Sequence, residues 1–209
     1  MNRIVTADEV DAYVFCGEIC SGKSKILKKI CEITKAAKFS TGQVIEDDLL
    51  KLSRLVNRYS MQAHGDTDPK RWALELAAKA YESMKEGKSA FGFECMRYPE
   101  QIQIMLDAFP RAFVVGVIAP FEMRFKWIRE RNRDGDPQTV EELREVDRRD
   151  WEGYLTKVGQ NTGGCFEMIE QLAREKRGII VYNKQEGEEY LEAHARKVIK
   201  AFDDLIGAA

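Results

Sequence analysis

The chain has 209 residues, and 44% of them are hydrophobic, which is enough to build one buried core of ordinary domain size. Its 33 basic and 35 acidic residues give a formal net charge of -2. No overall basic field therefore favours nucleic-acid binding, and anion binding must come from local clusters. We expect one core and no nucleic-acid partner.

The first residues lack the apolar stretch of a signal peptide, and no later stretch is apolar enough to span a membrane. Five cysteines occur in the chain, an odd number without the CxxC spacing of a zinc site. We therefore expect a cytoplasmic protein with reduced thiols and no membrane partner. As a monomer or a homodimer, it would bind a small-molecule partner.

Strands and helices are predicted to alternate along the chain. Short apolar runs predict strands, and apolar residues repeated every three or four positions predict helices. The predicted strands are 11–16, 37–40, 90–94, 112–118 and 178–183. The predicted helices are 23–35, 49–61, 69–85, 99–109, 121–131, one after the capping box at 139–142, one after the glycine-rich break at 159–164, and 188–206. Such alternation predicts an α/β fold of three α/β/α layers around a central parallel sheet.

Two helix starts have clear sequence signals. Asp68 is a typical N-cap, and Pro69 suits the first helical turn because that turn needs no amide donor there. Thr139 and Glu142 have the spacing of a capping box, in which each side chain satisfies a backbone amide of the other.

The run at 17–24 matches GxxxxGKS and lies between a predicted strand and a predicted helix, which is the context of a phosphate-binding P-loop. Its residues, all expected to contact phosphate, are Gly17, Glu18, Ile19, Cys20, Ser21, Gly22, Lys23 and Ser24. Lys23 would reach the β and γ phosphates of ATP, and the Ser24 hydroxyl would bind Mg²⁺. A turn that merely uses glycine would not explain the Lys-Ser pair. We expect ATP and Mg²⁺ as cofactors.

Further segments give the chain a family resemblance. Ser40-Thr41-Gly42 follows the first helix, and Glu94-Cys95-Met96-Arg97 ends a predicted strand. With the P-loop, they make the chain resemble P-loop nucleoside monophosphate kinases such as adenylate kinase. It is most similar to the small archaeal-type kinases that include dephospho-coenzyme A kinase-like proteins. The resemblance covers about 13–183 and includes the segments 96–100, 131–137 and 146–150.

The resemblance implies a fold and a domain organisation. It implies a P-loop NTPase fold in a single domain, 1–209, with a small lid and an acceptor-binding helical insertion. The acceptor-binding region would span about 40–88, and the lid about 124–150.

The resemblance also implies roles for residues at the end of the third predicted strand, 90–94, and just after it. Glu94 stands where the family has an aspartate that helps to hold Mg²⁺ through water or acts as a base toward the acceptor. Arg97 would clamp an acceptor phosphate, because its planar fork suits two oxygen contacts. Thr41 and Gly42 would line the acceptor site. The alternative for Glu94 is a solvated acid at the strand end, and the alternative for Arg97 is a surface ion pair.

Arginines gather in the segment that resembles a lid. Arg124, Arg129, Arg131 and Arg133 lie on a predicted helix and the turn after it. A lid supplies arginines that neutralise the transferring phosphoryl group and excludes water. We assign catalysis first to Arg131 and then to Arg133, and ATP binding to Arg129. A solvated helix face is the alternative for any single arginine.

The family also places an arginine after the lid and a contact to adenine after the last strand. Arg148 is our acceptor-binding candidate, although Arg149 beside it could face the site instead. Asn183 follows the last predicted strand and would contact ATP.

One departure from the family concerns the acceptor. Adenylate kinases carry an arginine that grips the acceptor monophosphate where this chain has Glu46. An acid repels phosphate. Either Arg54, Arg58 or Arg71 replaces that arginine, or the group that faces this segment is not a monophosphate.

The sequence therefore predicts an ATP-dependent kinase that transfers the γ-phosphoryl group to a nucleotide or nucleotide-like small molecule, similar to a (deoxy)nucleoside monophosphate kinase. Dephospho-coenzyme A kinase is the alternative, in which a ribose hydroxyl accepts the phosphoryl group and Glu94 serves as the base. From another class, an ATP-binding switch with slow hydrolysis is possible. A polynucleotide-end kinase is disfavoured by the near-neutral charge.

Overall fold

The computed structural model describes residues 5–156 and 160–207. Their strands form one five-stranded sheet in the order β2-β3-β1-β4-β5, and every neighbouring pair is parallel. The strands are β1 (Asp11–Gly17), β2 (Ala37–Ser40), β3 (Ala90–Met96), β4 (Ala112–Ile118) and β5 (Gly178–Tyr182). The predicted α/β fold with a central parallel sheet is confirmed.

Helices follow the strands in chain order, after a short 3-10 helix, η1 (Ala7–Glu9). They are α1 (Lys23–Thr34), α2 (Thr41–Lys51), α3 (Arg58–Gly65), α4 (Pro69–Lys85), α5 (Pro99–Ala108), α6 (Phe121–Arg131), α7 (Val140–Thr156), α8 (Thr162–Arg174) and α9 (Glu188–Ile206). Asp68 caps α4 by accepting from the Arg71 amide at 3.1 Å, as predicted. Thr139 and Glu142 form the predicted capping box of α7.

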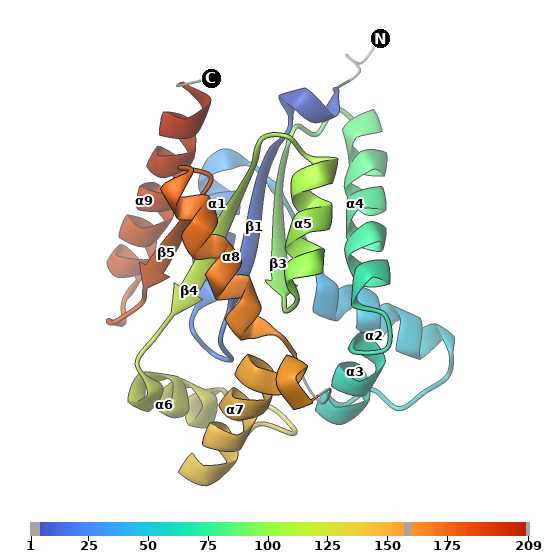
Figure 1. Cartoon of the computed structure of the whole chain (residues 1–209), viewed down its shortest axis with the longest axis vertical. Helices are drawn as coiled ribbons and strands as arrows, with labels where there is room; N and C mark the ends of the chain where they lie inside the picture. The colour runs from blue at the N-terminus through green and yellow to red at the C-terminus, as the bar shows by residue number, and fades with distance from the viewer. Residues whose placement is uncertain (1–4, 157–159, 208–209) are drawn as a thin grey trace.

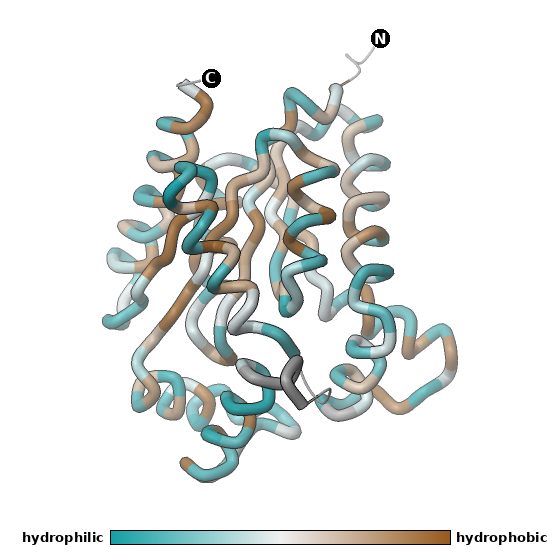
Figure 2. Tube along the Cα trace, viewed as in Figure 1, coloured by the Kyte–Doolittle hydropathy of each residue, from teal (hydrophilic) through white to brown (hydrophobic). Residues whose placement is uncertain are grey.

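The sheet is covered on both faces. Alternate residues of β1 point to opposite sides, so that Val14 packs with α4, α5 and α8 while Phe15 packs with α1 and α9. Figure 1 shows α5 and α8 on one side of the strands, and Figure 2 shows hydrophobic residues concentrated along the sheet and the helix faces that meet it. Parallel strands that are buried on both faces have nearly continuous apolar sequences, and for this reason the sequence predicts them.

The carboxyl ends of the strands all point to one end of the molecule. There lie α2, α3 and the segment formed by α6 and α7, while the two termini lie at the opposite end (Figure 1). Ligands of open parallel sheets bind outside the carboxyl ends of the strands. The fold thus brings the phosphate loop after β1 next to the ends of β2 and β3.

The predicted helix 49–61 is wrong. It is two helices, because α2 begins at Thr41 and ends at Lys51, and α3 begins only after Asn57. The Asn57 side chain accepts from the Ser60 amide at 2.9 Å and so caps a new helix. Ser53 has a φ of 53°, a left-handed conformation that a helix interior does not allow.

Other boundaries also differ from the prediction. The strand β3, predicted to end at Glu94, continues to Met96. The predicted glycine-rich break includes residues 157–159, which lie outside the described part of the chain. Gly163 and Gly164 belong to α8, whose N-cap Asn161 accepts from the Gly164 amide at 2.9 Å. None of the helices in the described residues combines the length and apolar character that a membrane crossing requires.

Candidate active site

The phosphate loop joins β1 to α1, as its sequence predicts. Gly22 has a φ of 89°, and a Cβ atom there would lie 2.2 Å from the Asn183 side-chain nitrogen. Gly17 is packed as tightly, since its Cβ would lie 2.4 Å from the Val117 carbonyl oxygen. Only glycine fits at both positions, which leaves the loop backbone free to present its amides at the start of α1.

Asn183, which directly follows β5, holds the backbone of the phosphate loop. Its side-chain amide donates to the Ser21 carbonyl oxygen at 2.9 Å, and only 2% of the residue is exposed. The structure thus places this predicted ATP contact against the loop backbone. The neighbouring Ser21 hydroxyl is buried without a hydrogen-bond partner among the described residues.

Lys23 lies inside the site and is 6% exposed. Its ammonium donates to the Glu18 carbonyl oxygen at 2.8 Å. Burial, followed by the charge of Arg97, lowers the pKa of Lys23 from 10.5 to about 8. A polyphosphate would offset both effects, because it brings negative charge to the ammonium.

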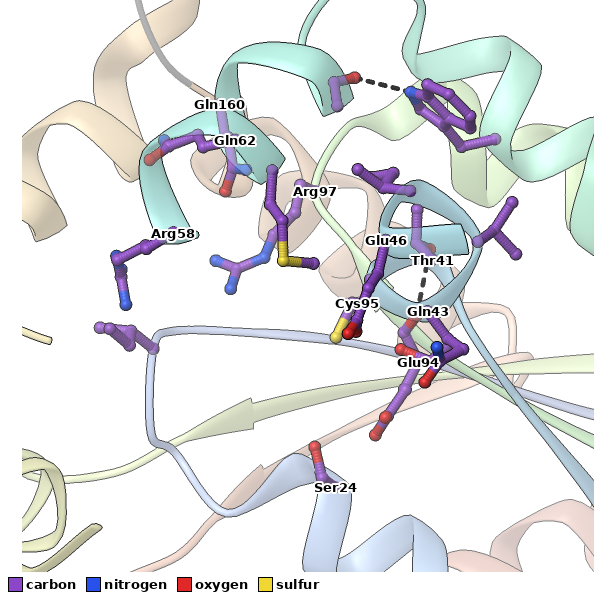
Figure 3. A pocket seen from close by; sticks show the side chains of 18 of the residues that line it. Ser24, Thr41, Gln43, Glu46, Arg58, Gln62, Glu94, Cys95, Arg97 and Gln160 are labelled. Carbon is purple, nitrogen blue, oxygen red and sulfur yellow. Dashed lines mark hydrogen bonds between the residues drawn. The ribbon is translucent and has the colours of Figure 1, made fainter. Parts of the chain in front are cut away.

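Glu94 occupies an irregular point of β3. The register of β3 against β1 shifts between the pairs Val14 with Phe93 and Cys16 with Met96, and such bulges redirect side chains. One Glu94 carboxylate oxygen, Oε1, lies 3.0 Å from the Lys38 ammonium. The other, Oε2, is buried and has no hydrogen-bond partner in the described chain. Figure 3 shows the Glu94 side chain on the side of the pocket toward Ser24.

The phosphate loop opens into a cavity of about 860 Å³, a volume typical of small-molecule sites. Its walls come from the loop, α2, α3, the ends of β2 and β3, and the turn between α6 and α7. The predicted site residues that line it are Ile19, Cys20, Lys23, Ser24, Thr41, Gly42, Glu94, Arg97, Arg131 and Arg133. Predicted site residues from four separate stretches of the sequence are therefore brought together.

Asp136, in the α6–α7 turn, joins two arginines at the cavity wall. Arg131 donates to both of its carboxylate oxygens, at 2.9 and 2.6 Å, and Arg58 of α3 donates at 3.2 Å. The Asp136 side chain is 1% exposed. This network ties the α6–α7 segment to α3.

Arg97, which directly follows β3, lines the same cavity. Its Nη1 atom is 3.5 Å from an Asp150 carboxylate oxygen. Burial disfavours the Arg97 cation, but the negative charges around it, Asp150 first, leave its pKa raised. Nη1 is buried and has no hydrogen-bond partner in the part of the chain that the structure describes. Arg97 can therefore still donate to a ligand.

Arg124, Arg129 and Arg148, three of the arginines considered in the predicted lid region, do not line the cavity. Arg129 donates to Gln138, and Arg148 donates to Glu145 on an exposed surface. Arg124 is 3% exposed and makes paired bonds of 2.8 and 2.7 Å to Asp147. Its Nε atom also lies 3.3 Å from Glu18, so Arg124 ties the phosphate loop to α7.

Arg149, the alternative to Arg148, is the more buried of the two. Its Nη2 atom lies 3.3 Å from Asp150. Of the arginines considered as a replacement at the acceptor wall, Arg58 lines the cavity. Arg71 instead pairs with Asp48 and Glu75.

Lys38, Asp136 and Asp150 were missed from the sequence as site residues. Lys38 is on the short strand β2 and resembles any solvated lysine in sequence. In the sequence, Asp136 lies in a polar stretch with Gly135 and Pro137, and Asp150 simply follows Arg149. Their partners are 53 to 78 positions away in the sequence, so only the fold reveals these pairs. The separations follow from Glu94 with Lys38, Asp136 with Arg58 and Asp150 with Arg97.

The side chains fit Mg²⁺ bound with a nucleotide. The Ser24 hydroxyl lies at the start of α1, and the unpartnered Glu94 oxygen supplies a hard, negative ligand. Among the described residues there is no cluster of three or more His, Cys, Asp or Glu that would hold a metal alone. The site therefore suits Mg²⁺ that arrives with phosphate oxygens.

No model of a known protein family matches the chain. A UPF0200 protein from Thermococcus kodakarensis is 26% identical over 193 residues, which cover 89% of this chain and 93% of that protein. Among solved structures, a gluconokinase from Sinorhizobium meliloti has a TM-score of 0.52 at 12% identity, over 95% of this chain and 94% of its own. A sugar kinase from Janibacter sp. has a TM-score of 0.53 at 14% identity, over 92% and 95%. The chain has the P-loop kinase fold.

A shikimate kinase from Acinetobacter baumannii, solved with shikimate, has the same fold. Its TM-score is 0.51 at 14% identity, over 91% of this chain and 92% of its own. The resemblance to P-loop kinases is thus confirmed for the fold. In this P-loop kinase fold, the 17–24 loop and the cavity beside it lie at the carboxyl end of the sheet, where parallel sheets bind ligands.

Proposed function

We propose that the chain is a Mg-ATP-dependent kinase that transfers the γ-phosphoryl group to a small molecule in the cavity. The observation that carries this proposal is the cavity itself. It joins Lys23 of the phosphate loop, the unpartnered oxygen of Glu94 and a second wall built from α2 and α3. An ATP-binding switch would not need a space for a second molecule beside the phosphate loop.

In the donor half, this chain's residues would bind and neutralise the polyphosphate of ATP. The loop amides and Lys23 contact its β and γ phosphates, while Arg131 and Arg133 approach the transferring group from the α6–α7 turn. Mg²⁺, when bound, neutralises phosphate charge, and Ser24 and Glu94 would hold it. We infer that the α6–α7 segment is a lid that excludes water when it closes.

In the acceptor half, we propose a nucleotide or nucleotide-like molecule. Apolar Ile45 and Met61 lie there beside the amide side chain of Gln62, a combination that suits a ring with polar edges. Figure 3 shows Gln62 and Arg97 around the same space. A nucleoside monophosphate and dephospho-coenzyme A both fit this description and differ in the oxygen that accepts phosphate.

A coupled ADP-release assay tests the proposal. Mg-ATP is supplied with each nucleoside, each nucleoside or deoxynucleoside monophosphate, and dephospho-coenzyme A. At least one acceptor is expected to raise ADP release well above the rate with ATP alone, and Lys23→Met is expected to abolish that stimulation. If every acceptor leaves the rate at the level of ATP alone, the chain is an ATP-hydrolysing switch and the kinase proposal is wrong.

A further inference from the structure

The α6–α7 segment packs against the phosphate loop through a small apolar cluster. Ile19 of the loop packs with Ile128 of α6 and Leu143 of α7, and at most 5% of each residue is exposed. Partly buried neighbours complete the cluster: Cys20, Phe121, Phe125 and Val146. Figure 1 shows α6 and α7 together beyond the carboxyl ends of the strands. The loop that would bind phosphate is therefore in direct contact with the segment that carries Arg131 and Arg133.

Arg124 lies beside this cluster, with its guanidinium carbon 5.6 Å from the centre of the Phe121 ring. Its terminal nitrogens donate to the two carboxylate oxygens of Asp147 at 2.8 and 2.7 Å, and its Nε atom lies 3.3 Å from Oε2 of Glu18. Burial, the largest effect, disfavours the Arg124 cation, but Asp147 and Glu18 leave its pKa raised. Arg124 is thus a cation held between one acid of the loop and one acid of α7.

Glu18 extends this network to the lysine of the phosphate loop. Burial, the largest effect, raises the pKa of the Glu18 carboxyl, and the charge of Arg124 opposes that rise. The Glu18 carbonyl oxygen accepts from the Lys23 ammonium at 2.8 Å. Glu18 therefore contacts Arg124 through its side chain and Lys23 through its backbone. Direct contacts lead in this way from Lys23 to Asp147 on α7.

Arg124 is not placed to bind phosphate itself. It is 3% exposed and is absent from the described walls of the cavity. Arg131 lines the cavity and lies on the same helix, roughly two turns beyond Arg124. Because both belong to α6, the position of Arg124 on the loop also determines where Arg131 lies. Without the guanidinium, the carboxylates of Glu18 and Asp147 would repel each other.

We propose that Arg124 is a positioning residue that holds the α6–α7 segment on the phosphate loop, so that a nucleotide bound by the loop also places Arg131 for phosphoryl transfer. The inference rests on the proposed function and goes beyond it by naming the contact that joins the nucleotide site to the lid. Loss of this contact should leave Mg-ATP binding largely intact, because the loop and Lys23 remain. It should slow transfer and admit water, because the lid no longer closes in register with the loop.

Hydrogen exchange measured by mass spectrometry tests the link without any acceptor. In the wild-type protein, Mg-ATP is expected to slow amide exchange about tenfold or more both in the loop and in residues 121–150. In Arg124→Met, the slowing should remain in the loop and be lost from 121–150. Asp147→Asn removes the charge at the other end of the link and should give the same result, which keeps the test valid if Arg124→Met does not fold. Arg144→Met, an exposed change on α7, is the matched control.

Transfer to an acceptor gives a second readout. Arg124→Met and Asp147→Asn are expected to lower kcat about tenfold, to change KM for ATP by less than about threefold, and to form more ADP than phosphorylated acceptor. Arg144→Met should behave as wild type in each measurement.

The outcomes separate the link from the kinase function. If Mg-ATP protects 121–150 equally in wild type, Arg124→Met and Asp147→Asn, the inference is wrong, while the kinase function stands wherever an acceptor is phosphorylated. Variants that lose stability in urea but keep the wild-type exchange pattern and kcat would make the role of Arg124 purely structural and overturn the inference. If the wild-type protein phosphorylates no acceptor, the kinase function fails, and the exchange result alone decides the link.

Discussion

The side-chain amide of Asn183 donates to the carbonyl oxygen of Ser21 at 2.9 Å and so joins the end of β5 to the phosphate loop. The contact is buried, and the Gly22 backbone lies directly against the same side chain. The sequence suggested that Asn183 contacts ATP, but its position makes it a support of the loop that binds the phosphates. Changes at Asn183 should therefore affect nucleotide binding through the loop.

Asn183→Ala should weaken Mg-ATP binding about tenfold, because a lost buried hydrogen bond costs roughly 1–3 kcal/mol and leaves the Ser21 carbonyl unpaired. Isothermal titration calorimetry measures the effect. Lys184→Ala, an exposed change at the next position, is the control and should bind Mg-ATP normally. Equal affinities for Asn183→Ala and wild type would show that the loop does not depend on this bond.

Asp136→Asn should destabilise the protein. The buried Asp136 carboxylate neutralises Arg131 and Arg58, which are partly exposed, and removal of its charge leaves both arginines without their acid. We expect the free energy of unfolding to fall by about 2 kcal/mol, because the amide keeps part of the hydrogen bonding. Urea denaturation measures it, with the exposed Asp134→Asn as the matched control. The prediction is wrong if the two variants unfold at the same urea concentration.

Lys38→Met should lower kcat more than it changes KM for ATP. Lys38 holds one Glu94 oxygen at 3.0 Å, so its loss frees the carboxylate to rotate away from the transfer position. A decrease in kcat of about tenfold is expected, and Lys38→Arg should restore most of it, since a cation remains. Lys51→Met, on an exposed part of α2, is the control. An effect on KM alone would place Lys38 in ligand binding.

The lowered pKa of Lys23 predicts a pH dependence of stability. In the folded, ligand-free protein this pKa is about 8, against 10.5 for an ordinary lysine. Between these values the unfolded chain holds a proton that the folded chain has released, so the contribution of Lys23 to the free energy of unfolding rises with pH. The rise ends above the unfolded value, and it is absent below the folded one.

Lys23→Met removes that titration. The difference in the free energy of unfolding, wild type minus Lys23→Met, should grow by roughly 3 kcal/mol from neutral pH to about pH 10.5. Urea denaturation of both proteins across this range measures it. A difference that stays constant with pH would mean that Lys23 keeps an ordinary pKa in the folded state.

The strands of the core were predictable because buried parallel strands are continuous apolar runs, as at 112–118. The P-loop was predictable because its chemistry lies in eight consecutive residues. The break between α2 and α3 was not, because apolar residues continue through Leu52, Leu55 and Val56, although α2 ends at Lys51 and Asn57 begins α3 with a capping bond. Periodicity does not detect a cap that lies inside an apolar stretch.

The acceptor site was less predictable than the phosphate loop. Glu94 and Arg97 could be predicted because they lie together at the end of one strand, in an order that resembles the kinase family. Nothing in the sequence indicates that Asp150 lies beside Arg97 or that Asp136 lies beside Arg58, because these pairs form between distant elements. An arginine can bind the anion of a ligand only if its acidic partners leave it free to do so. The groups that the acceptor site can bind could therefore be inferred only from the fold.

Transfer of phosphate to an acceptor is the central claim, and mass spectrometry of the reaction products tests it most directly. Wild-type protein is incubated with Mg-ATP and the acceptors above, beside Glu94→Gln. We expect an acceptor that has gained one phosphoryl group in amounts equal to the ADP formed, and a rate about a hundredfold or more lower for Glu94→Gln. ADP formed together with free phosphate and no phosphorylated acceptor would contradict the kinase function.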